Sequence, residues 1–95
     1  MTEIGQQMSN LDKQRRRALF RAWHRGLREL DLILGEFADG EIATLSLDEL
    51  QQFERLMEAP DTDVLKWIVG QEPVPVRYDT TVFAKILASR SARAS

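Results

Sequence analysis

Apolar residues recur at intervals of three and four positions along most of this 95-residue chain. The segment 27–37 shows the pattern most clearly, with apolar side chains at Leu27, Leu30, Leu34 and Phe37. This is the spacing of one face of an α-helix, whereas a half-buried strand alternates at every second residue. No segment alternates well enough to require a strand. The sequence therefore predicts an all-α fold, a compact single-domain bundle of about five short helices.

The first two helices are expected at residues 11–24 and 27–37. Gly26 separates them, because a glycine inside a helix costs about 1 kcal/mol relative to alanine. Asp39-Gly40 is a turn signal, and we expect it to follow the end of the second helix.

The third helix has the strongest start signal. Ser46 followed three residues later by Glu49 is a capping box, in which each side chain accepts a hydrogen bond from the backbone N–H of the other residue. Pro60 should end this helix or open the next element. Asp61 or Thr62 can then cap a short fourth helix.

The remaining boundaries depend on glycine, proline and a second pair of capping residues. Gly70 is placed to stop the fourth helix. Two prolines predict an extended segment at residues 71–77. Asp79 or Thr80 can cap a final helix, and residues 89–95 are expected to fray.

The apolar faces of these helices are sufficient for one core. We expect it to contain Leu19, Trp23, Leu30, Leu34, Phe37, Leu50, Phe53, Leu56, Leu65, Trp67, Ile68, Phe83 and Leu87. Residues 11–88 are thus predicted to form the folded five-helix domain. Residues 1–10 are expected to be a flexible N-terminus, and residues 89–95 a polar C-terminal tail.

The composition excludes several kinds of site. The chain has no cysteine, so disulfides, thiolate metal sites and cysteine nucleophiles are ruled out. His24 is the one histidine, and no glycine-rich phosphate loop or hydrolase motif is present. We therefore expect no enzymatic activity, no metal and no stably bound cofactor.

No apolar run approaches the roughly 20 residues needed to span a bilayer. Residues 1–10 are polar and do not resemble a secretory signal. We expect a cytoplasmic protein of bacterial type, or a protein of the mitochondrial matrix if the source is eukaryotic. A monomer is expected, since one core accounts for the apolar residues.

Charge is unevenly distributed along the chain. Residues 11–28 contain seven bases and one acid, whereas residues 29–63 contain eleven acids and one base, although the net charge is only −2. Two interpretations remain open. The basic helix can lie beside the acidic ones and be neutralised by them, or it can attract a charged partner. Nucleic-acid-binding domains are usually strongly basic overall, and this chain is not.

The densest cluster of charged residues lies where the first two helices meet, at Arg25-Gly26-Leu27-Arg28-Glu29. Gly26 would allow another backbone to approach closely, and the guanidinium of Arg25 offers several donors. Arg25 and Glu29 would share a face if this segment were helical. These residues can form a docking patch for a partner. The alternative is a helix junction with a surface ion pair worth about 0.2–0.5 kcal/mol.

The run from Arg25 to Asp31 resembles the Arg-Gly-x-x-Glu signature of the succinate dehydrogenase assembly factors, the flavinylation factors called SdhE in bacteria. A second block also resembles that family: Phe53-x-x-Leu56-Met57-Glu58-x-Pro60-Asp61-x-Asp63-x-Leu65-x-Trp67. It departs from the family pattern at Met57, where leucine is usual, and at Pro60 and Val64. The resemblance covers roughly residues 16–73.

The resemblance implies a five-helix protein without enzymatic activity that binds the flavoprotein subunit of succinate dehydrogenase and, in some bacteria, of fumarate reductase. Such factors promote covalent attachment of FAD to a histidine of that subunit, so FAD stays with the partner. Arg25, Gly26 and Glu29 match the signature and should lie at the partner interface. Arg28 belongs to the same patch, and Asp63 of the second block is a helix-start residue that can also face the partner.

Two alternatives compete with this interpretation. One is a nucleic-acid-binding helical module that uses the basic segment Lys13–Arg28. The other is an antitoxin-like regulatory protein, a label sometimes attached to members of this family. The sequence does not decide the full set of flavoprotein clients, direct contact with FAD, or the role of residues 78–95.

Overall fold

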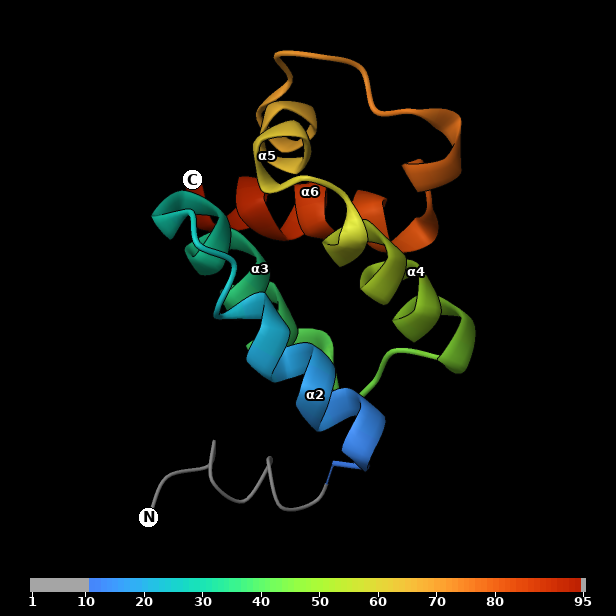
Figure 1. Cartoon of the computed structure of the whole chain (residues 1–95). Helices are drawn as coiled ribbons and strands as arrows, with labels where there is room; N and C mark the ends of the chain where they lie inside the picture. Colours follow the sequence, from blue (N-terminus) through green and yellow to red (C-terminus); the bar gives the residue numbers. More distant parts are fainter. Residues whose placement is uncertain (1–10, 95) are drawn as a thin grey trace.

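The computed structural model describes residues 11–94, so the expected flexible segment 1–10 lies outside the described residues (Figure 1). No strand occurs between residues 11 and 94, and the predicted all-α fold is confirmed. Five α-helices and one short 3-10 turn follow one another in the order α2 (Lys13–Ala22), α3 (Arg28–Glu41), α4 (Leu47–Glu58), α5 (Asp61–Val69), η1 (Val76–Tyr78) and α6 (Thr81–Ala94).

The helices are arranged around one core. α2 packs against α3 and α4, while α6 packs against α3 and α4 from the other side (Figure 1). α5 packs against α3. The radius of gyration is 12.8 Å. That value is close to the ~13 Å of a folded domain of 100 residues.

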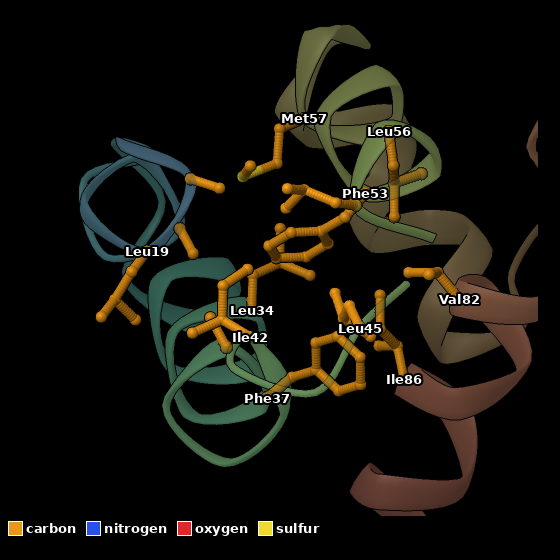
Figure 2. Close-up of a cluster of buried hydrophobic side chains, with 14 of the residues drawn as sticks. Leu19, Leu34, Phe37, Ile42, Leu45, Phe53, Leu56, Met57, Val82 and Ile86 are labelled. Atoms are coloured by element: carbon orange, nitrogen blue, oxygen red, sulfur yellow. The ribbon is translucent and has the colours of Figure 1, made fainter. Parts of the chain in front are cut away.

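The core is built mainly from large side chains of α3, α4 and α6. Figure 2 shows Phe37 and Phe53 meeting near its centre, and their ring centroids are 5.5 Å apart. Leu34, Ile42, Leu45, Leu56, Val82 and Ile86 lie around them, all at most 2% exposed. Burying a side chain of this size contributes about 1.5–3 kcal/mol, so this cluster contributes substantially to the stability of the fold.

The predicted core is correct at Leu19, Leu30, Leu34, Phe37, Leu50, Phe53, Leu56, Ile68 and Phe83. Trp23, Leu65 and Trp67 are only partly buried and pack against the edge of the core. Leu87 is 36% exposed, so its assignment was wrong. Ile42 and Leu45 were not predicted, because they lie in the connection after α3, where no periodic pattern marks a buried face.

Local capping signals are confirmed at three helix ends. The backbone N–H of Glu49 donates to Ser46 Oγ at 3.1 Å, and the N–H of Ser46 donates to Glu49 Oε1 at 3.0 Å, which completes the capping box of α4. Thr80 Oγ1 accepts from the N–H of Phe83 at the start of α6. Gly70 ends α5 with φ of 83°, a left-handed conformation that glycine adopts without steric cost.

Two boundary predictions were wrong. Asp39-Gly40 does not form a turn, because α3 continues to Glu41 and buries Ala38 against the core. Neither Asp61 nor Thr62 caps α5. Its cap residue is Pro60, without a side-chain hydrogen bond, and Asp61 is the first helical residue.

The C-terminal part also differs from the prediction. Residues 71–77 were predicted to be extended. Residues 71–75 form no helix, in keeping with their prolines, but Val76–Tyr78 forms the 3-10 turn η1. The last helix does not end before Ser89. It continues to Ala94, through most of the segment expected to be a polar tail.

Trp23 links the end of α2 to the middle of α3. Its Nε1–H donates to Asp39 Oδ1 at 3.1 Å, and its ring lies directly over Gly35. A Cβ atom added to Gly35 would be only 2.3 Å from the Trp23 ring. Gly35 therefore leaves room for the indole, which fixes how α2 enters the turn that follows it.

Within the described residues, we find no helix both long enough and apolar enough to span a bilayer.

Candidate partner-binding site

We call residues 25–29, between α2 and α3, the corner. The chain leaves the helical conformation after Ala22, and Gly26 has φ of 101°. This positive φ is strained for any residue with a side chain. Space is not the constraint, since the nearest atom to a Cβ added at Gly26 would be Asp61 Oδ2 at 4.0 Å. The signature glycine is thus required by the backbone turn, and it is exposed to solvent.

Arg25 clamps the corner to the start of α5. Its Nη2 and Nε donate to Asp61 Oδ1 at 2.7 and 3.1 Å, and Nη2 also donates to the carbonyl oxygen of Met57. The Arg25 side chain is only 12% exposed and that of Asp61 22% exposed. The backbone N–H of Arg25 donates to Asp31 Oδ1 at 2.6 Å. Arg25 therefore ties together segments that are far apart in the sequence.

The expected pairing of Arg25 with Glu29 does not occur. Gly26 interrupts the helix between them, so the two side chains do not share a helical face. The carboxylate partner of Arg25 is Asp61. The Arg25 guanidinium, which the sequence analysis assigned to the partner interface, is thus largely engaged inside the molecule. Its pair with Asp61 links the two family-like blocks.

The exposed polar groups of the corner are Gly26, Arg28 and Glu29. Arg28 and Glu29 are the first two residues of α3, where Glu29 lies in the positive field of the helix start. Their side chains face solvent beside the exposed backbone of Gly26. The structure therefore brings three of the five predicted site residues together on one accessible surface.

An open groove runs from the corner along α5. It encloses about 460 Å³ and is lined by Leu27, Glu29, Thr62, Leu65, Lys66, Val69 and Gln71. Val69 is 38% exposed, so the groove presents an apolar side chain to solvent. Sequence reasoning missed this groove. The signal was present in the spacing of residues 62, 65, 66 and 69, which lie on one face of a helix.

Asp63 lies in the first turn of α5 and is half-buried. It is not among the residues that line the groove. It shares its face of α5 with Trp67, four residues on, whose ring stacks on Tyr78 with centroids 5.1 Å apart. The structure therefore does not bring Asp63 together with Arg28 and Glu29.

No group of three or more histidine and carboxylate side chains able to hold a metal ion occurs among residues 11–94. The groove combines apolar side chains with one acid and one base, Glu29 and Lys66. Such a surface suits recognition of another protein through shape, apolar contact and charge. The fold and the site together define a small helical binding protein.

Comparison with known proteins assigns this binding protein more narrowly. A family model described as flavinator of succinate dehydrogenase matches residues 16–90, and the chain belongs to that family. The match includes the whole corner and all of α3, α4 and α5. The comparison with solved structures finds no significant match.

Curated relatives come from bacteria and from mitochondria. The chain is 35% identical over 78 residues to the FAD assembly factor SdhE of Acetobacter pasteurianus, which covers 82% of this chain and 72% of that protein. It is 34% identical over 80 residues to the mitochondrial succinate dehydrogenase assembly factor 2 of Dictyostelium discoideum, covering 84% of this chain and 57% of the relative. The chain thus spans little more than half the length of the second protein.

Proposed function

We propose that this protein is an assembly factor that binds the flavoprotein subunit of succinate dehydrogenase and promotes covalent attachment of FAD to it. The family match over residues 16–90 carries this proposal. The names of the bacterial and mitochondrial relatives support it. The flavoprotein subunit of fumarate reductase is a second client of the same kind. We also propose that the factor acts as a monomer, in the bacterial cytoplasm or its mitochondrial equivalent.

The corner and the groove are the proposed docking surface. Gly26 presents backbone without a side chain, so the partner can approach closely there, while Arg28 and Glu29 supply opposite charges next to it. Leu27, Leu65 and Val69 supply the apolar contact. Arg25 acts indirectly in this arrangement, since its pair with Asp61 holds the corner against α5.

In this proposal the factor donates no reacting group. FAD and the target histidine both remain on the partner, and binding favours the partner conformation in which the two are aligned. Correct alignment of two reactants can lower a barrier by several kcal/mol without any added catalytic group. The factor binds FAD neither covalently nor stably.

The test measures covalent flavin on the purified flavoprotein subunit incubated with FAD and the factor. The informative variants are Glu29→Gln and Arg28→Ala, because both residues are exposed and each change should alter stability by no more than about 0.5 kcal/mol. Asp48→Asn and Arg55→Ala are the matched controls, since both residues are exposed on α4 and neither lines the groove, and Asp48 lies in the first turn of α4 as Glu29 lies in the first turn of α3.

We expect wild type and both controls to raise covalent flavin, and Glu29→Gln to reduce the rate about tenfold at limiting factor. If wild type leaves covalent flavin unchanged, the proposed function is wrong. If the corner variants work as well as wild type while folded, the function stands but the assigned surface is wrong.

A further inference from the structure

The outer face of α2 has a composition that the fold does not explain. Four exposed side chains, at positions 13, 16, 17 and 20, lie on the face of the helix that points away from the core, and His24 continues it after the helix end. We call this set the basic stripe: Lys13, Arg16, Arg17, Phe20 and His24. Phe20, at its middle, is 60% exposed.

The cations of the basic stripe form no ion pair within the described part of the chain, although Arg16 donates a hydrogen bond to the carbonyl oxygen of Leu11. The ion pairs seen among the described side chains of residues 11–91 join Asp12 to Arg15, Asp61 to Arg25, Glu72 to Lys66 and Glu49 to Lys85. None of them includes Lys13, Arg16 or Arg17. α2 does lie beside the acidic helices α3 and α4, but these three cations form no ion pair with them. Lys13 and Arg17 also form a like-charge pair four residues apart, which destabilises an isolated helix slightly.

Phe20 and His24 form a preorganised aromatic pair. Their rings stack with centroids 4.0 Å apart and an interplanar angle of 15°. His24 Nδ1 lies 2.7 Å from the carbonyl oxygen of Phe20. Because a carbonyl oxygen can only accept, this contact assigns the hydrogen to Nδ1. Nε2 is then available to form a hydrogen bond with a partner. Exposed aromatic side chains beside arginines are a composition typical of protein interfaces.

We propose that the basic stripe is a second docking surface, which receives an acidic segment of the flavoprotein subunit that carries an apolar side chain to cover Phe20. This inference rests on the proposed function. Charge complementarity carries it, since Lys13, Arg16 and Arg17, none of them in an ion pair within the described residues, share one exposed face with an exposed aromatic ring. His24 directly precedes Arg25, so one bound partner can contact the basic stripe and the corner together.

Nucleic acid fits this surface less well. Eleven acids between residues 29 and 63 leave the chain with a net charge of −2, so most of the molecule repels a phosphate backbone. A protein segment with its own acidic and apolar side chains matches both the cations and the exposed ring of Phe20.

The experiment measures the affinity of the full chain for the purified flavoprotein subunit at low and at physiological ionic strength. Two variants disrupt the stripe: Phe20→Ser, and the charge reversal Arg16→Glu with Arg17→Glu. Leu47→Ser and Arg55→Glu are matched controls on α4, where Leu47 is 63% exposed and Arg55 is also exposed. Circular dichroism confirms that each variant is folded.

We expect the charge reversal to weaken binding about tenfold or more at low ionic strength, and to flatten the dependence of affinity on salt. Phe20→Ser should weaken binding at both ionic strengths, and the controls should bind like wild type. At saturating concentration, the stripe variants should restore wild-type covalent flavinylation, because their corner is intact.

The inference is overturned if the stripe variants bind like wild type, or if the controls lose as much affinity as they do. It is also overturned if wild type binds a short DNA duplex more tightly than the flavoprotein subunit. If wild type neither binds that subunit nor raises its covalent flavin, the proposed function fails, and the inference fails with it. Loss confined to the stripe variants while wild type flavinylates normally supports both.

Discussion

The corner and the basic stripe are both rich in arginine and adjoin each other in the chain, but the structure uses their charges in opposite ways. Arg25 in the corner turns inward and donates from its guanidinium to Asp61 and a backbone carbonyl. Arg17 on the basic stripe is exposed and forms no ion pair with the described side chains of residues 11–91. An arginine in a signature can therefore be there to shape a surface, while one outside the signature supplies the surface itself.

The largest expected effect contrasts these two arginines directly. Arg25→Ala should lower the free energy of unfolding by about 2–4 kcal/mol, because it leaves the half-buried carboxylate of Asp61 and the Met57 carbonyl without their donor. Arg17→Ala should change it by less than about 0.5 kcal/mol. Urea unfolding followed by circular dichroism measures both values. Equal losses would erase the distinction between a structural and a free arginine.

A second contrast tests how the Trp23 indole, which lies between Phe20 of the basic stripe and Arg25 of the corner in the chain, packs on α3. Gly35→Ala should cost about 1–3 kcal/mol, because the new methyl group would displace the Trp23 ring from α3. Gly40→Ala lies in the same helix with no atom within 4 Å of the added carbon, and should stabilise by about 0.5–1 kcal/mol. Thermal unfolding of the two variants should shift in opposite directions. A rise in stability for both would show that Trp23 is not held against Gly35.

The third change acts on the backbone of the corner alone. Gly26→Ala should cost about 1–2 kcal/mol, since φ of 101° is unfavourable for alanine although space is free. Gly26→Asn should cost less, because asparagine tolerates positive φ better than alanine does. The free energies of unfolding from urea titration separate the two substitutions. If alanine and asparagine cost the same, backbone strain is not the reason for the glycine.

The smallest expected effect depends on pH and concerns the start of α2. The backbone N–H of Arg15 donates to Asp12 at 2.8 Å and, with the Arg15 side chain, holds the pKa of Asp12 below its usual value of 3.8. A carboxyl group with a lowered pKa in the folded state stabilises the fold above its unfolded pKa. That stabilisation is lost as the pH falls through the folded value.

Asp12→Asn is the test of this pH dependence, because asparagine caps a helix well but does not titrate. The stability difference between wild type and Asp12→Asn should therefore be constant near neutral pH and shrink below about pH 4. Urea unfolding at a series of pH values measures it. A difference that does not change with pH would mean that the charge of Asp12 contributes nothing to stability.

The pKa of Glu49 is lowered in the same way, by the hydrogen bond from the Ser46 backbone N–H and then by Lys85.

Features determined by a few neighbouring residues could be predicted from the sequence. The capping box at Ser46, the Thr80 cap and the left-handed Gly70 each depend on contacts within three or four residues. The exposed position of Gly26 at a break between helices is of the same kind. The family-like motifs also located the corner correctly along the chain.

Features that depend on tertiary contacts could not be predicted. Asp39-Gly40 is typical of a turn locally, but burial of Ala38 and the hydrogen bond from the Trp23 indole to Asp39 favour continued helix. Arg25 had an acid four residues away, yet it pairs with one 36 residues away. The groove was missed for the same reason, since it forms only where Leu27 and α5 come together.

The clamp between Arg25 and Asp61 limits how the corner could be copied. A synthetic peptide of residues 25–29 would carry the whole signature but neither the carboxylate nor the Met57 carbonyl that hold its first residue. Such a peptide would not keep the positive φ at Gly26 or the position of Glu29 beside α5. Any mimic or graft intended to compete with this protein must therefore include the junction of α4 and α5 as well.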